Sequence, residues 1–331
     1  MTFDPRPDRA ATFDSPSRFD RTLLRAGSDL RQLGIDPAGK GWHRVRRGIW
    51  LPPGTWGTLD YDRRFQAFVH ATVLSCDEPT EVILAAHSAA ALLGMPSIGP
   101  WPKHVRLLDP EGVAGSSRHI RMFHGEPAQP IRVDGVLLTP PDRTIVDLAR
   151  VGTLDTALAA ADYALRTGMC TREQIAAEAA LIPAGARNRG VAHLVAELAD
   201  GRSESAGESL SRLQMFRANF VRPELQTEFY DSDGFIGRTD FDFEEAQLVG
   251  EFDGQLKYKV PPDASPQEAG EIVWREKQRE DRLRRQRRIA RWVWQTARDT
   301  AALARLLIEH GLKPQPRSTW IDLGHQRRRA S

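Results

Sequence analysis

The sequence is poor in cysteine, in net charge and in long apolar runs. Its 331 residues include only two cysteines, Cys76 and Cys170, too few for a disulfide scaffold or a cysteine-rich zinc module. The longest apolar stretches, such as residues 83–95, contain polar interruptions and are too short to span a bilayer, so we expect no membrane association. The first residues carry acids and no apolar core segment, which argues against a signal peptide. These features predict a cytoplasmic protein.

The net charge is close to zero, with 46 Lys and Arg against 44 Asp and Glu. This balance excludes a uniformly basic protein that coats nucleic acid, and it excludes an acidic disordered protein. The apolar fraction of 40%, together with 26 glycines, is typical of a globular chain. The length predicts two or three domains.

Composition and periodicity divide the chain into five segments. Residues 1–20, rich in Pro, Asp, Ser and Arg, predict a poorly ordered leader. Residues 21–60 predict a winged-helix-like module, with a helix that ends near Gly34 and an alternating strand over residues 42–51. Residues 61–200 alternate helices and strands, which predicts a middle α/β domain. Residues 201–315 predict the order α-β-β-β-α-β-α, and residues 316–331 form a basic tail. The predicted class is therefore α/β, in an α+β multi-domain arrangement.

The basic strand over residues 42–51 has two interpretations. As the wing of a winged helix it would place Arg44, Arg46 and Arg47 against nucleic acid. As an ordinary exposed strand it would carry the same residues without a ligand. The pattern alone leaves both open.

Three residues of the middle segment could suggest catalysis: His87, His124 and Asp147. None has the spacing of a metal site or a catalytic triad, so we expect structural roles for all three. Arg143 and Asp147 are four residues apart, which predicts an ion pair on one helix face.

Residues 240–254 form an acidic pattern that predicts a hairpin. A turn centred on residues 245–246 places Asp240 directly opposite Glu251, with Asp242 on the same face as Asp240. Like charges that face each other destabilise a hairpin, and a divalent cation would compensate them. We therefore predict that Asp240 and Glu251 hold Mg²⁺ or Mn²⁺, with Glu208 of the preceding helix as a third carboxylate. The alternative is an ordinary hairpin with its polar face in solvent.

Five blocks between residues 207 and 294 resemble the core of the PD-(D/E)XK nuclease superfamily, in its very-short-patch-repair-endonuclease-like branch. They read Gly207-Glu208-Ser209-Leu210-Ser211-Arg212, Thr239-Asp240-Phe241, Gly250-Glu251-Phe252-Asp253-Gly254 with Lys257-Tyr258, Glu276-Lys277-x-Arg279-Glu280-Asp281-x-Leu283, and Arg291-Trp292-x-Trp294. The resemblance implies a restriction-endonuclease-like αβββαβ core. It also implies metal-dependent hydrolysis of DNA phosphodiester bonds, in phage defence or DNA repair.

The resemblance also implies roles for individual residues. Asp240, Glu251, Asp253 and Lys257 are the catalytic candidates, and Glu208 joins Asp240 and Glu251 around the metal. The superfamily pattern has a lysine two residues after the glutamate, where this chain has Asp253. Lys257 would then supply the positive charge from further along the strand.

Residues 30–175 resemble the abortive-infection type IV antitoxin family, which is AbiEi-like. The carriers are Trp42-x-Arg44-Val45-x-Arg47-Gly48, His87-Ser88-Ala89-Ala90-x-Leu92-x-Gly94 and Thr139-Pro140-x-x-Arg143-Thr144-x-x-Asp147-Leu148-Ala149. This resemblance implies a winged-helix DNA-binding module and an α/β domain. The missing lysine two residues after Glu251 favours the alternative function, an antitoxin-like transcriptional regulator with an inactive nuclease-like domain. A toxin partner or a homodimer would accompany that function.

A basic segment over residues 275–291 carries nine basic residues against three acids and is predicted to be helical. Lys and Arg contacts to phosphate dominate affinity for nucleic acid, so the segment predicts a DNA-binding surface. Its candidate contact residues are Arg275, Lys277, Arg279, Arg282 and Arg284. The alternative is a solvated helix face whose arginines pair with nearby acids.

Overall fold

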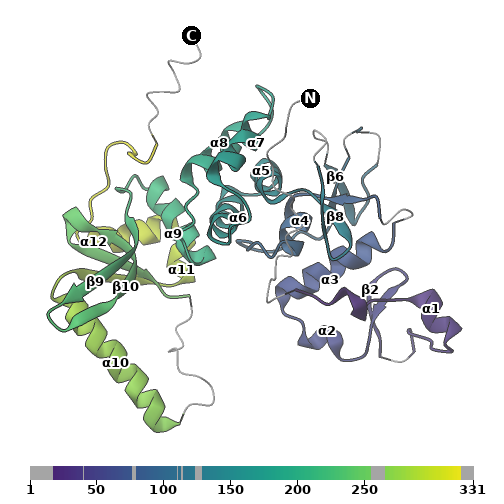
Figure 1. Ribbon diagram of the computed structural model, residues 1–331, viewed down its shortest axis with the longest axis horizontal. Helices are drawn as coiled ribbons and strands as arrows, with labels where there is room; N and C mark the ends of the chain where they lie inside the picture. Colours follow the sequence, from purple (N-terminus) through teal and green to yellow (C-terminus); the bar gives the residue numbers. More distant parts are fainter. Residues whose placement is uncertain are drawn as a thin grey trace. The chain divides into compact units, whose positions relative to one another are not determined.

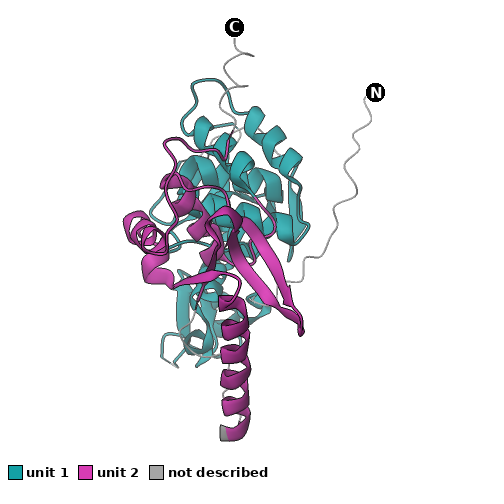
Figure 2. Ribbon diagram, turned by 90° about the vertical axis from the view of Figure 1, so that its left-hand side faces the viewer, with its two compact units in different colours: residues 1–199 teal, residues 200–331 magenta. Residues whose placement is uncertain are grey.

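The computed structural model describes residues 18–39, 41–76, 80–109, 111–112, 115–123, 129–254 and 265–321. The chain forms two compact units, unit 1 over Met1–Ala199 and unit 2 over Asp200–Ser331 (Figure 2). Both units combine helices with antiparallel or mixed sheets, so the predicted α/β multi-domain class is confirmed. Within the described residues, no helix is both long enough and apolar enough to cross a membrane.

Unit 1 begins with a small three-stranded sheet in the order β1-β3-β2. Its elements are η1 (Arg21–Leu23), β1 (Arg25–Ala26), α1 (Gly27–Gln32), β2 (His43–Arg46) and β3 (Ile49–Leu51). Strands β2 and β3 form an antiparallel hairpin, and Gly48 at its turn has a φ of 80°, which favours glycine. The single strand predicted over residues 42–51 is instead two strands, because the chain turns at residues 47–48 and pairs back on itself. The described residues between α1 and β2 form turns, so they do not provide the second helix of a helix-turn-helix pair.

The next helices are α2 (Thr55–Thr58) and α3 (Tyr61–Val73). Apolar residues of α3 share one core with the small sheet; the cluster comprises Phe19, Leu24, Ile49, Leu51, Leu59, Ala67 and Ala71. The Gln66 side chain of α3 also accepts a hydrogen bond from the Phe19 amide at 2.7 Å. The expected boundary at residue 60 therefore lies within a hydrophobic core.

The rest of unit 1 is a five-stranded mixed sheet with helices, in the strand order β6-β5-β4-β8-β7. Figure 1 labels β6 and β8 of this sheet and the helices α4 to α8. Its elements are β4 (Ile83–Leu84), α4 (Ala86–Leu92), β5 (Val105–Leu108), β6 (Ile120–Phe123), β7 (Ile131–Val133), β8 (Val136–Leu138), α5 (Pro141–Val151), α6 (Leu154–Arg166), α7 (Arg172–Ala180) and α8 (Arg189–Leu198). The predicted pair of Arg143 and Asp147 is confirmed as a buried ion pair of 2.8 Å on α5.

Unit 2 is a four-stranded sheet in the order β12-β11-β10-β9. Its elements are α9 (Ala206–Arg217), β9 (Glu224–Asp231), β10 (Gly234–Phe243), η2 (Glu244–Ala246), β11 (Leu248–Phe252), α10 (Pro266–Arg284), β12 (Arg288–Trp292), α11 (Trp294–Ala297) and α12 (Thr300–Glu309). The predicted order α-β-β-β-α-β-α is observed, with two short helices, η2 and α11, that the prediction did not include. The predicted helix over residues 275–291 is too long, because α10 ends at Arg284 and Arg291 lies in β12.

The two faces of this sheet carry different cores. On one face Phe241 stacks on Trp292, whose indole Nε1 donates to Ser211 of α9 at 2.8 Å. On the other face a cluster of Phe229, Ile236, Val249 and Ile289 packs against Leu283 near the end of α10. Because side chains alternate along a strand, the acidic positions of β10 and β11 fall on the face of α10.

Candidate active site

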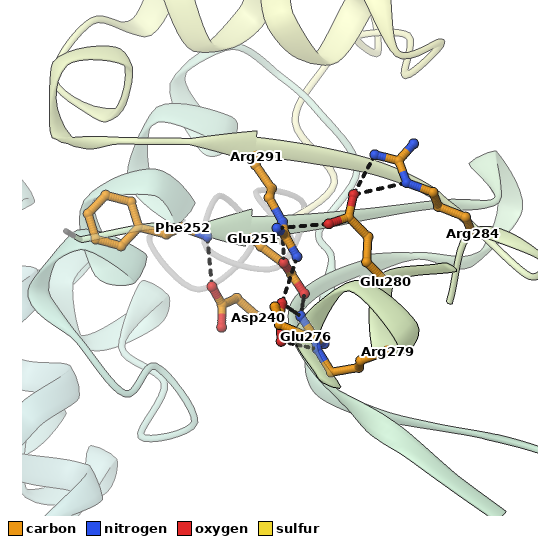
Figure 3. A network of polar contacts seen from close by, with 8 residues as sticks. All are labelled: Asp240, Glu251, Phe252, Glu276, Arg279, Glu280, Arg284 and Arg291. Atoms are coloured by element: carbon orange, nitrogen blue, oxygen red, sulfur yellow. Dashed lines mark hydrogen bonds and ion pairs between the residues drawn. The ribbon is translucent and has the colours of Figure 1, made fainter. Parts of the chain in front are cut away.

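The predicted hairpin register is confirmed. Phe241 pairs with Gly250 and Phe243 pairs with Leu248, so the same register places Asp240 opposite Glu251. Figure 3 shows both carboxylates on neighbouring strands, with α10 beside them. The site lies where β10 and β11 run antiparallel, just before the chain leaves β11.

Asp240 is a half-buried carboxyl group among other acids. Its Oδ2 accepts a hydrogen bond from the Phe252 amide at 2.7 Å. Burial, and then the negative charges of Glu208 and Glu251, raise the pKa of Asp240 to about 7. A carboxyl group in this state favours either a proton or a cation.

Glu208 is fixed by hydrogen bonds at the start of α9. Its Oε1 accepts from Ser205 at 2.8 Å, and its Oε2 accepts from the Glu204 amide and from Gln226, each at 2.9 Å. Burial raises the pKa of Glu208. Both oxygens of Glu208 already accept hydrogen bonds. This geometry suits a residue that orients a water molecule or adds negative electrostatic potential at Asp240.

Glu251 is bound by two arginines. Arg279 of α10 donates to one of its oxygens at 3.0 Å, and Arg291 of β12 donates to the other at 2.7 Å. The same arginines reach Glu276 at 2.8 and 3.1 Å, and Arg291 also lies 3.2 Å from Glu280. The result is one network of alternating charge on the α10 face (Figure 3).

Three other arginines of the basic segment also pair within the chain. Arg282 binds Asp231, Arg284 binds Glu280 and Arg275 binds Glu271. These three side chains and Arg279 therefore agree with the alternative interpretation of the segment, in which its arginines pair with nearby acids. Arg275 and Arg284 remain largely exposed, at 75% and 58%, and Lys277 is also exposed, so these residues still present charge to solvent.

The three arginines predicted in unit 1 differ in exposure. Arg44 and Arg47 are exposed on the hairpin of β2 and β3. Arg46 is half-buried, with its guanidinium 5.7 Å from the ring centre of Phe68, and burial lowers its pKa. Arg44 and Arg47 are thus the better placed to reach a polyanion.

The remaining candidates contribute less to the described site. Lys257 and His124 lie outside the described residues. Asp253 is exposed, and its amide donates to the carbonyl of Trp292 at 2.8 Å. His87 lies edge-on to Trp101, and burial lowers its pKa to about 4, which suits a neutral structural histidine.

Sequence reasoning missed the partners that hold this site in place. Ser205 is the N-cap of α9, and the Ser-x-x-Glu spacing from Ser205 to Glu208 is a recognisable helix-start signal. Gln226, with a left-handed φ of 56°, has no such signal. The sequence predicts Arg291 as part of a basic surface, and in the structure its exposed side chain pairs with Glu251.

Asp240 and Glu251 are the carboxylates of this site that could take part in binding a hard divalent cation. Among the described residues, no group of three or more His, Cys, Asp or Glu side chains is arranged to hold a metal. Mg²⁺ needs fewer protein ligands, since one or two carboxylates commonly bind it together with waters and substrate phosphates. Asp240 and Glu251 provide two such carboxylates, and Arg279 and Arg291 already bind both oxygens of Glu251. Burial is the main cause of the raised pKa of Asp240, and a cation would offset the smaller part that comes from neighbouring negative charge.

Comparison with known proteins finds similar sequences but does not assign the chain to a protein family. No protein-family model matches the chain. Two uncharacterized proteins of Mycobacterium tuberculosis are each 34% identical to it over 166 residues. The match covers 50% of this chain and 60% of each relative, so the chain spans less than two thirds of their length.

Proposed function

We propose that unit 2 is a divalent-metal-dependent nuclease that hydrolyses DNA phosphodiester bonds, in phage defence or DNA repair. The observation that carries this proposal is the pair of Asp240 and Glu251, opposed on neighbouring strands with Glu208 behind them. The order of elements and the motifs of residues 207–294 support it. The two cysteines, Cys76 and Cys170, fit a reducing cytoplasm as the place of action.

The chain's own residues have distinct roles in this proposal. Asp240 and Glu251 would hold Mg²⁺ or Mn²⁺, which when bound lowers the pKa of a coordinated water and neutralises phosphate charge. Glu208 orients groups at Asp240 through its fixed carboxylate. Arg279 and Arg291 provide positive charge beside Glu251, where the developing charge of a scissile phosphate would be stabilised.

Cleavage of supercoiled DNA tests this function. Asp240→Asn and Glu251→Gln should each lower the cleavage rate in Mg²⁺ or Mn²⁺ by more than about 100-fold, since even residues behind metal ligands commonly cost 10- to 100-fold. Glu245→Gln, which removes an exposed carboxylate from the adjacent turn, is the matched control and should retain full activity. Cleavage that survives Asp240→Asn would contradict the proposal.

A second function has its own supporting observation. Glu251 is neutralised by two arginines, and Asp253 stands where the superfamily has its lysine. These features favour an antitoxin-like DNA-binding regulator with an inactive nuclease-like unit, working with a toxin partner or as a homodimer. Such a protein would bind DNA without cutting it.

Salt dependence of DNA binding tests the exposed arginines in either case. Arg44→Ala and Arg47→Ala should each reduce the slope of log affinity against log salt by about 1, because each removes one phosphate contact. Fluorescence anisotropy with a labelled duplex at several salt concentrations measures this slope. Arg166→Ala removes an exposed arginine elsewhere in unit 1 and should leave the slope unchanged. Identical slopes in all three variants would exclude the hairpin as a DNA contact.

A further inference from the structure

Unit 1 contains a cavity of about 370 Å³ to which the proposed function assigns no role. Three arginines from separate elements line it: Arg106 of β5, Arg150 in the last turn of α5, and Arg187 just before α8. Phe123, the last residue of β6, provides an apolar wall. None of the described residues that line the cavity is acidic.

The arginine side chains have unused hydrogen-bonding capacity. Within the described part of the chain, the Nε atoms of Arg106 and Arg150 are buried and have no hydrogen-bond partner. The guanidinium of Arg150 lies 5.1 Å from the ring centre of Phe123, which holds it at the cavity wall. A buried donor without an acceptor is unfavourable. An anionic oxygen in the cavity would give the guanidinium groups that line it a charged acceptor.

The nearest buried acid does not neutralise the cavity. Asp147 lies on α5 one turn before Arg150, and its carboxylate is already paired with Arg143 at 2.8 Å. Burial lowers the pKa of Arg106, and the charge of Asp147 opposes that effect in part. Glu178 adds a second acid near Asp147. Two acids against Arg106, Arg143, Arg150 and Arg187 leave the local charge positive.

The backbone adds to the positive potential. Asn188, the N-cap of the ten-residue helix α8, lines the cavity, and its side-chain amide donates to the Arg150 carbonyl at 2.8 Å. This bond ties the start of α8 to the end of α5 and so fixes two walls of the cavity. The positive end of the α8 dipole therefore lies at a site already lined by arginines.

We propose that this cavity binds a phosphate group carried by a ligand of about mononucleotide size. Guanidinium groups match phosphate oxygens in geometry and charge, and convergent arginines are typical of phosphate recognition. The volume lies within the range of small-molecule sites. The phosphate could belong to a free nucleotide or to the end of a nucleic-acid strand, which present the same chemistry to the cavity.

Isothermal titration with defined probes tests the site. The probes are inorganic pyrophosphate, dAMP and a short DNA strand with either a 5′-phosphate or a 5′-hydroxyl group. Arg150→Gln and Arg187→Gln should each weaken binding of the phosphate-bearing probes about tenfold or more, the usual effect of losing a charged hydrogen bond. Arg187 is exposed on a loop, so its variant should fold normally, which thermal unfolding checks.

The controls distinguish binding in the cavity from nonspecific attraction of phosphate to exposed arginines. Arg166→Gln removes the same charge from an exposed position on α6 and should not change binding. Preference for the 5′-phosphorylated strand that disappears in Arg187→Gln would identify strand ends as the source, whereas binding of dAMP alone would identify a free nucleotide. Either result supports the site. No binding of any probe at millimolar concentration, or equal weakening by Arg166→Gln, would overturn it.

Discussion

Alanine in place of Gly207 is expected to destabilise unit 2 by about 1–3 kcal/mol, the usual cost of overpacking a well-packed contact. A Cβ atom at this position of α9 would lie 1.9 Å from Cε1 of the Phe252 ring. The ring packs edge-on against Trp294, so moving it away from α9 would disturb a second contact. Urea unfolding followed by circular dichroism measures the change.

The same substitution at Gly270 provides a control with the opposite sign. Gly270 lies on the exposed part of α10, and a Cβ there would meet no atom of the described chain within 4 Å. Alanine should therefore stabilise this helix by up to about 1 kcal/mol through its higher helix propensity. Combining Gly207→Ala with Phe252→Ala should cost less than the sum of the two changes, because the smaller residue removes the clash. Equal effects at both glycines would show that α9 does not depend on a close approach to Phe252.

Asparagine in place of Asp240 is expected to stabilise unit 2 at pH 8 and to have little effect near pH 4. The pKa of Asp240 is about 7 in the folded protein and 3.8 in the reference state, so folding favours its protonated form. The stability from proton uptake is complete below pH 3.8 and is lost as the pH rises through 7. Each pH unit in this window is worth at most about 1.4 kcal/mol, which gives an upper limit of about 4 kcal/mol.

Urea unfolding at pH 5, 6, 7 and 8 in the presence of EDTA measures this effect. The free energy of unfolding of the wild type should fall with rising pH relative to that of Asp240→Asn. Glu245→Gln, at an exposed turn position, should follow the wild type. Under the proposed function, Mg²⁺ should narrow the gap at pH 8 by stabilising the wild type and not Asp240→Asn. Parallel pH profiles of wild type and Asp240→Asn would show that this carboxyl group has an ordinary pKa.

Much of unit 2 could be predicted because its signals are local. Alternating side chains and a turn over residues 245–246 fix the register of β10 and β11, and hence the opposition of Asp240 and Glu251. The long helix α10 starts at Ser265 with a complete capping box and a proline in its first turn.

Other features lacked a local signal. Strands β4, β7 and β8 have two or three residues each, too few to show a period, and α8 starts at Asn188 without a side-chain cap. The partners of Glu251 could not be predicted either. Arg279 and Arg291 lie 28 and 40 residues away in sequence, so their pairing depends on how α10 and β12 pack. Sequence separation predicts only the ion pairs within one helix, between residues three or four apart, such as Arg279 with Glu276.

The strand order β12-β11-β10-β9 places both carboxylates of the candidate site on the two inner strands. Amides of inner strands exchange with solvent hydrogen only when neighbouring strands separate, so Phe241 and Gly250 should be among the slowest-exchanging residues of unit 2. The positions of Asp240 and Glu251 relative to each other are then kept until β10 and β11 separate. A ligand would therefore bind a conformation of the two carboxylates that is already populated in the free protein. It would not depend on a rare conformation of a flexible loop.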